Sequence, residues 1–80
     1  MKKKSIKIDG VEYEVRELTT GQGAHIFAGE QDNIVLNLAK ASIYADGEAL
    51  GDKLDDLGLS VTMRLLPIVN EIYGLSEGND

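Results

Sequence analysis

The chain has 80 residues, of which 42% are apolar, and 14 acidic residues against 8 basic ones give it a net charge of -6. This length predicts a single domain over residues 1–80 with a modest core, and the charge disfavours broad binding to nucleic-acid phosphates. The absence of cysteine excludes disulfides and thiolate metal ligands. Because a domain of this size is marginally stable without such cross-links, we expect it to associate with itself or with a partner.

The basic residues are concentrated at the start of the chain, where half of them occur at positions 2, 3, 4 and 7. We interpret residues 1–5 as a basic N-terminal extension and residues 76–80 as a polar tail. Acidic residues follow the lysines at once, so the apolar segment of a signal peptide does not follow the basic start. No apolar run approaches the roughly 18 residues of a membrane-spanning helix. We therefore expect a cytoplasmic protein without a membrane partner.

The first predicted element is an antiparallel β-hairpin. Ile6 and Ile8 alternate with polar residues, and residues 11–15 alternate in the same way after Asp9-Gly10. An Asp-Gly pair suits a type I′ turn, in which both central residues have positive φ. Because an isolated two-stranded hairpin is unstable, its apolar face is expected to lie on helices.

Two helices are predicted in the middle of the chain. The segment Leu18-Thr19-Thr20 offers a threonine cap for a short helix over residues 21–28, which places Ala24, Phe27 and Ala28 on one side. Residues 29–31 are expected to form a break. Asp32 then caps a second helix that ends near Tyr44, since the apolar residues between them recur at helical spacing.

A turn and a short amphipathic helix are predicted next. Residues 45–48 contain an Asp-Gly pair and predict a turn, and leucines at positions 50, 54 and 57 follow at helical spacing. Together with the last helix, these elements predict an α+β fold in which an N-terminal antiparallel β-hairpin packs on three to four short α-helices.

The last predicted helix has more apolar residues than one helix face needs. It is expected to run from an N-cap at Ser60 to Gly74, with a kink at Pro67. The stripe expected to face the core consists of Val61, Leu65, Ile68 and Ile72. The second stripe, Leu66, Val69 and Tyr73, is the candidate protein interface. Leu66→Asp or Val69→Asp is therefore predicted to abolish association and to leave the helical content intact.

Residues suited to catalysis or cofactor binding are scarce. His25 is the only histidine and is expected at the surface, since without cysteine it has no typical partners for a zinc site. Gly21-Gln22-Gly23 resembles part of a dinucleotide loop, but Ile26 occupies the place of the third glycine. The acidic residues between positions 46 and 56 are interrupted by core leucines, unlike a calcium loop. We predict no enzymatic activity, no cofactor and no metal.

The order of the predicted elements resembles that of the small tail assembly chaperones of long-tailed bacteriophages. The similar stretch runs from about Ile6 to Leu75, and Arg16-Glu17-Leu18-Thr19-Thr20-Gly21 is similar to the Arg-x-(Pro or Leu)-Thr segment that leads from hairpin to helices in that family. The resemblance implies a non-enzymatic chaperone in the host cytoplasm that binds the tape-measure protein, keeps it soluble and helps to recruit tail-tube subunits.

Two other functions remain open at this stage. An acidic inhibitor or nucleic-acid mimic would align its carboxylates in rows against a basic groove of a host enzyme, and salt would weaken its binding. A small structural subunit of the virion would use similar apolar contacts but would stay in the finished particle.

For the chaperone function, the expected partners are the tape-measure protein and the tail-tube protein, and we also expect the chain to form a homo-oligomer.

Overall fold

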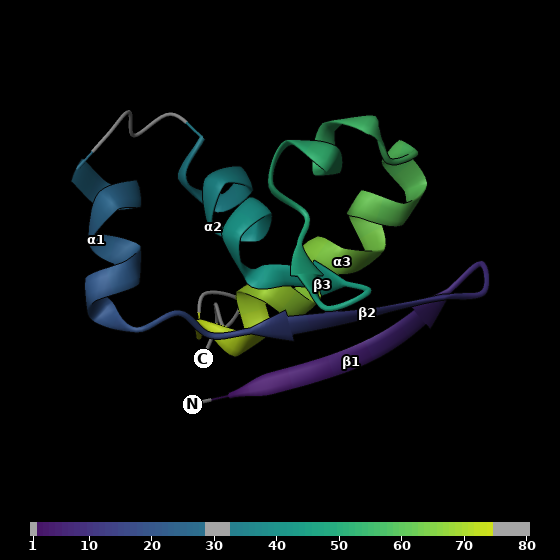
Figure 1. Ribbon diagram of the computed structural model, residues 1–80, viewed down its shortest axis with the longest axis horizontal. Coiled ribbons are helices and arrows are strands. Elements are labelled where there is room, and N and C mark those ends of the chain that lie inside the picture. The colour runs from purple at the N-terminus through teal and green to yellow at the C-terminus, as the bar shows by residue number, and fades with distance from the viewer. Residues whose placement is uncertain (1, 29–32, 75–80) are drawn as a thin grey trace.

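The computed structural model describes residues 2–28 and 33–74, which form an antiparallel sheet with helices on one of its faces (Figure 1). The strands lie in the order β1-β2-β3-β4. The predicted α+β fold with an N-terminal hairpin is confirmed. The elements in chain order are β1 (Lys3–Ile8), β2 (Val11–Arg16), α1 (Thr20–Ala28), α2 (Ile34–Ser42), β3 (Ile43–Ala45), β4 (Glu48–Ala49), the 3-10 helix η1 (Gly51–Asp56) and α3 (Leu59–Ile72).

Two Asp-Gly turns connect the strands. Asp9 and Gly10 have φ angles of 52° and 82°, and Ile8 pairs with Val11 across this turn, which confirms the predicted hairpin. The second turn has φ angles of 56° at Asp46 and 83° at Gly47, and it joins β3 to β4. The predicted turn is therefore correct, but the two strands beside it were missed. They are only three and two residues long, too short to show an alternating pattern.

The N-terminal lysines belong partly to the sheet. Strand β1 begins at Lys3, and Lys3 and Lys4 pair with Arg16 and Val15 of β2. The prediction that residues 1–5 form an extension is therefore wrong for residues 3–5, because the partner strand is long enough to continue the ladder. The predicted polar tail, residues 76–80, lies outside the described residues.

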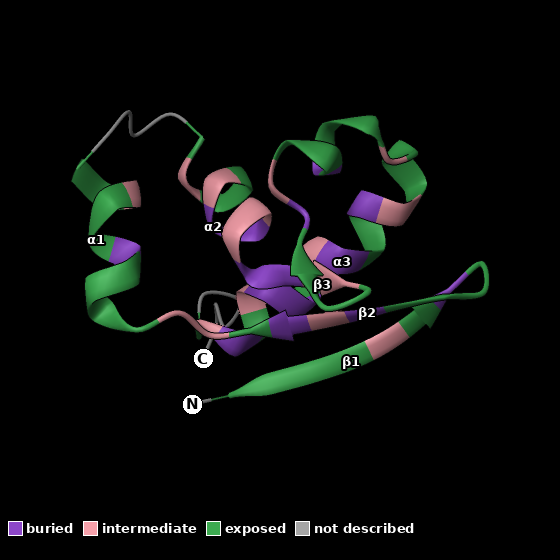
Figure 2. Cartoon of the chain, in the orientation of Figure 1, coloured by how far each residue is buried: buried purple, intermediate pink, exposed green. Residues whose placement is uncertain are grey.

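The core lies between the sheet and the helices α2, η1 and α3 (Figure 2). Along β2, Tyr13 and Val15 point into it, and their polar neighbours Glu12 and Glu14 occupy the other face of the sheet. The helices contribute leucines and β-branched residues to the same layer. The fully or nearly fully buried apolar side chains are Ile8, Val15, Ala39, Ile43, Leu54, Leu65 and Val69.

The start of α1 confirms the predicted threonine cap. The Gln22 N–H donates to Thr19 Oγ1 at 3.1 Å, and the Thr19 N–H donates to Gln22 Oε1 at 2.9 Å. This reciprocal pair is a capping box, which satisfies two backbone donors that the helix leaves unpaired. The helix begins at Thr20, one residue before the predicted start, so Gly21 and Gly23 lie inside its first turns.

The other two helix starts differ from prediction or cannot be compared with it. Asp32 and the predicted break over residues 29–31 lie outside the described residues, and α2 begins at Ile34 after Asn33. Ser60 is not the N-cap of α3, because the helix begins at Leu59 and the carbonyl of Gly58 accepts the Val61 and Thr62 N–H groups. Because Ser60 lies inside the first turn, its hydroxyl does not take the N-cap role that the sequence predicted.

The C-terminal half agrees with the sequence pattern in two further respects. Leu50 and Leu54 are buried around η1, as predicted, although the segment forms a 3-10 helix and Leu57 is only half-buried. Gly74 follows α3 with a φ of 70°, a left-handed conformation that glycine adopts without steric cost. Pro67 lies inside α3, and the kink there remains a prediction.

The inner face of α3 includes one residue that was assigned to the interface. Leu65, Ile68 and Ile72 are buried, as predicted, and Val61 is half-buried. Val69 is 0% exposed, so the prediction that it belongs to an outward stripe is wrong. The reason is geometric, because Val69 follows Leu65 by four residues and therefore lies on the same row of the helix.

Candidate protein-binding site

An apolar groove lies between α1 and the body of the protein. It has a volume of about 500 Å³ and opens to the surface beside the C-terminal end of α3. Leu38 of α2 and Tyr73 contribute one wall, and α1 contributes the other. The remaining lining residues are Glu17, Leu18, Thr19, Thr20, Gly23, Ala24 and Phe27. Ligand-binding grooves are commonly concave and apolar with a few polar groups, as here.

The groove exists because α1 packs only lightly on the body. Gly23 is its single buried residue, and Figure 2 shows most of the helix as exposed. Ala24, Phe27 and Ala28, predicted to share one side, are all exposed, and the side chain of Phe27 remains 55% accessible. A nine-residue helix with small residues at its contacts leaves space that larger side chains would fill.

The hydroxyl group of Tyr73 fixes this wall residue of the groove in place. Its hydroxyl oxygen accepts the Leu18 N–H at 2.9 Å and lies 2.6 Å from Ser42 Oγ, which is fully buried. These bonds connect the segment after β2 with the ends of α2 and α3. Tyr73, one of the candidate interface residues, is therefore a half-buried wall residue with its polar end satisfied inside the protein.

A second apolar surface lies on the outer side of α3. Leu59 is 73% exposed and Met63 is 64% exposed, and Leu66, another candidate interface residue, follows at the next position of the same row as a half-buried side chain. Sequence reasoning missed Leu59 because it was placed before the helix, and missed Met63 because neither predicted stripe included it. The spacing of four and then three residues could have revealed the row.

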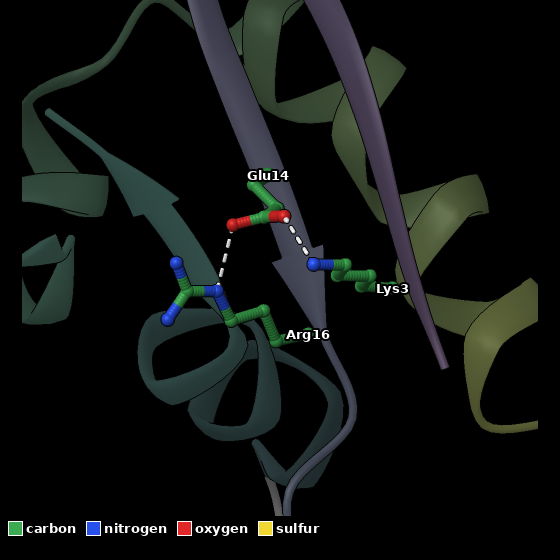
Figure 3. Close-up of polar contacts among 3 residues, drawn as sticks. All are labelled: Lys3, Glu14 and Arg16. Atoms are coloured by element: carbon green, nitrogen blue, oxygen red, sulfur yellow. Dashed lines mark hydrogen bonds and ion pairs between the residues drawn. The ribbon is translucent and has the colours of Figure 1, made fainter. Parts of the chain in front are cut away.

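The face of the sheet that carries no helix is charged but balanced (Figure 3). Glu14 Oε1 lies 2.7 Å from Arg16 Nε, and Glu14 Oε2 lies 3.9 Å from Lys3 Nζ. The Arg16 guanidinium also lies 4.1 Å from the centre of the Tyr44 ring, a favourable cation–π contact. This mixture of signs differs from the uninterrupted rows of carboxylates that a nucleic-acid mimic requires.

The acidic residues near η1 are exposed, and two of them pair with Lys40. Lys40 Nζ lies 3.2 Å from Asp55 Oδ2 and 3.6 Å from Asp52 Oδ1. The hydrogen bond to Asp55 raises the pKa of the Lys40 amine above its ordinary value, and the charges of both carboxylates act in the same direction. Within residues 2–28 and 33–74, no cluster of histidine and carboxylates is arranged to hold a metal ion.

His25 lies exposed on α1, in agreement with its predicted surface position. It borders a shallow hollow between α1, α2 and η1, beside Lys40 and Asp52. A general base needs a nucleophile within hydrogen-bond reach and a group that orients it.

Comparison with known proteins adds no relative. The chain matches no protein-family model, no curated protein and no solved structure. None of the helices in the described part of the chain is long and apolar enough to cross a membrane.

Proposed function

We propose that this protein is a non-enzymatic tail assembly chaperone that binds the tape-measure protein and assists tail-tube assembly in the host cytoplasm. The observation that carries the proposal is the open apolar groove beside α1 on a small acidic chain. The occupant we propose is an amphipathic helix of the tape-measure protein. Its apolar face would enter the groove, in the mode by which many proteins bind helical segments.

The chemistry of the groove suits such a helix. Phe27 is exposed, Leu18 is half-buried and Leu38 is buried behind them. Full burial of an exposed apolar side chain contributes roughly 1.5–3 kcal/mol before the cost of association, and completing the burial of Phe27 contributes part of this. The net charge of -6 favours a partner whose polar face carries lysine or arginine, because opposite charges speed the encounter. Binding in the groove would cover the apolar face of the partner helix and keep that aggregation-prone helix in solution, which is the task of an assembly chaperone.

Co-expression with the tape-measure protein tests the proposal directly. We expect the wild-type chain to keep that protein in the soluble fraction and to be recovered with it in a pull-down. Phe27→Asp should abolish the recovery, because it places a carboxylate in the groove. Val35→Asp is the matched control, because it adds the same charge at an exposed apolar residue outside the groove. Val35 is 38% exposed and does not line the groove.

Three outcomes would contradict the proposal. Equal recovery with Phe27→Asp and with wild type would exclude the groove as the binding surface. Detection of the protein in purified particles would indicate a structural subunit instead. Binding that disappears as salt rises from low to physiological concentration would favour an acidic mimic, because apolar helix contacts depend less on ionic strength than exposed charge pairs do.

A further inference from the structure

We propose that the free edge of strand β1 binds an extended, acidic segment of a partner protein, which adds a further strand to the sheet. β1 is the first strand in the order β1-β2-β3-β4, and among the described residues it pairs with β2 alone (Figure 1). It is six residues long, against two for β4 at the opposite edge. An extended peptide can pair with such an edge through main-chain hydrogen bonds. No residue of β1 lines the groove beside α1, so the two sites are separate.

The alternation of hydrogen bonds in the hairpin identifies the backbone groups that point outward at this edge. The Glu17 N–H donates to the Lys2 carbonyl at 2.9 Å, and Ile8 pairs with Val11 across a two-residue turn. Both are hydrogen-bonded pairs, and such pairs alternate with non-hydrogen-bonded ones along an antiparallel ladder. The backbone groups of the even-numbered residues of β1 therefore point toward β2. The residues whose backbone groups point away from the sheet are Lys3, Ser5 and Lys7, and each offers one N–H donor and one carbonyl acceptor.

The charge of β1 indicates which kind of segment can pair with it. Lys3, Lys4 and Lys7 are exposed, and the strand contains no carboxylate, although the whole chain has a net charge of -6. Glu14 lies 3.9 Å from Lys3 and Glu71 lies 3.0 Å from Lys4, but these lysine side chains remain 70% and 52% exposed. Carboxylates on an added strand would lie beside the amines, and opposite charges on neighbouring strands attract each other.

Two other occupants fit this edge less well. A second copy of β1 in antiparallel register about Ser5 would place Lys3 opposite Lys7, and like charges directly opposite each other destabilise a sheet. A nucleic acid would supply phosphates for the lysines, but it cannot provide the alternating N–H and carbonyl groups that the free edge requires. The lysines therefore reject a similar strand, as charged residues on edge strands commonly do, and accept a strand of opposite charge.

Pairing at this edge also determines the sequence pattern of the partner segment. Side chains opposite Lys3, Ser5 and Lys7 would lie on the face of the sheet that carries no helix, because side chains alternate along a strand. Those opposite Lys4 and Ile6 would lie on the helix side, where Ile6 is half-buried and packs against the core. The edge therefore favours a segment of about five residues in which acidic or polar side chains alternate with apolar ones.

A synthetic peptide, Glu-Val-Thr-Val-Glu with blocked termini, tests the proposal, and Lys-Val-Thr-Val-Lys is its control. Amide hydrogen exchange measured by NMR reports on the edge residue by residue. At saturation the acidic peptide should slow exchange of the Lys3, Ser5 and Lys7 amides by about tenfold, because these N–H groups become hydrogen-bonded. The Lys4 and Ile6 amides, which already pair with β2, should change little. Lack of protection by the acidic peptide, or equal protection by both peptides, would overturn the proposal.

Two variants separate backbone pairing from attraction between charges, with binding of the labelled acidic peptide measured by fluorescence anisotropy. Ser5→Pro removes an outward N–H and leaves the ladder with β2 intact, since an edge strand tolerates proline at such a position. It should weaken binding by about tenfold, whereas Ser5→Ala should bind as the wild type does. Lys7→Glu should weaken binding by about threefold, and Lys53→Glu, the same change at an exposed lysine of η1, should not.

Three results would contradict the proposed occupant. Full binding by a Ser5→Pro or Lys7→Glu variant that circular dichroism shows to be folded would exclude pairing at this edge. Displacement of the peptide by a single-stranded oligonucleotide of equal charge would indicate a general site for anions. Protection of the Ser5 amide that rises with protein concentration, without peptide, would indicate a second copy. Phe27→Asp should bind the peptide as the wild type does, because Phe27 lines the groove, so failure of the edge and failure of the groove are distinguishable.

Discussion

The helices α1 and α3 show how differently two apolar segments can be used in one small protein. In α3, five residues are buried and Leu65 and Val69 have no accessible surface. In α1, only Gly23 is buried and the aromatic ring of Phe27 remains largely accessible. The 14 residues of α3 contact both strands of the first hairpin, whereas the nine residues of α1 contact chiefly α2. The length over which a helix contacts the sheet, more than its apolar content, decides which helix completes the core.

The difference matters for function because the two helices leave different surfaces exposed. A helix that packs lightly leaves a groove beside it, and a helix with two apolar faces leaves a row outside the core. In an 80-residue domain, the core cannot cover both. Three experiments test how firmly particular side chains contribute to the fold, in order of decreasing effect.

The largest effect is expected from the same substitution in the two helices. Val69→Asp places a carboxylate in the core, which costs more than about 4 kcal/mol, and the typical stability of a domain is only about 5–15 kcal/mol. We expect loss of the cooperative unfolding transition. Phe27→Asp should lower the free energy of unfolding by less than about 1 kcal/mol, as exposed sites do.

Urea denaturation followed by far-ultraviolet circular dichroism measures both effects. A folded Val69→Asp protein would indicate that Val69 faces outward, and it would contradict the burial of Val69 in the core. An unfolded Phe27→Asp protein would show that α1 contributes more to the core than its exposure indicates.

An intermediate effect is expected where the end of α3 meets the segment after β2. Tyr73→Phe removes the hydroxyl that accepts the Leu18 N–H and pairs with buried Ser42. Leaving these groups unsatisfied should lower the free energy of unfolding by about 1–3 kcal/mol. Tyr44→Phe keeps the ring under Arg16 and should change it by less than about 0.5 kcal/mol. Equal effects of the two variants would show that the Tyr73 hydroxyl does not bind the segments together.

The smallest effect concerns Lys40 and pH. Its pKa is raised in the folded protein, so the stabilisation is fully present below the ordinary value of 10.5 and is lost as pH rises through the raised folded value. The difference in Tm between wild type and Lys40→Met should be constant from pH 7 to about pH 9.5 and should shrink above about pH 10.5. A difference that is unchanged at high pH would show that the pairing with Asp55 and Asp52 does not stabilise the fold.

Several features could be predicted from the sequence because they depend on neighbouring residues. Asp9-Gly10 with alternating residues on both sides predicted the first hairpin, whereas Asp46-Gly47 predicted only the turn, because β3 and β4 are too short to show an alternating pattern. The threonine cap of α1 and the left-handed Gly74 likewise involve backbone groups within four residues. Such local interactions do not require knowledge of the remaining fold.

The candidate binding surfaces could be predicted only in part. Leu66 and Tyr73 do lie beside exposed apolar surface, but Val69 does not, and Leu59, Met63 and Phe27 were not included. Helical spacing shows which residues share a row, and it does not show which row meets the sheet. With apolar residues around most of α3, several rotations of the helix satisfy the same pattern.

The sequence by itself determined the α+β class, the first hairpin and the approximate ends of α1 and α3, because backbone conformation and capping are decided over a few residues. Only the tertiary structure decided which side of α3 enters the core, and only it brought Leu18, Phe27, Leu38 and Tyr73 together as one groove. The physical reason is that burial depends on how far each helix reaches over the sheet, and this is a property of the packed chain as a whole.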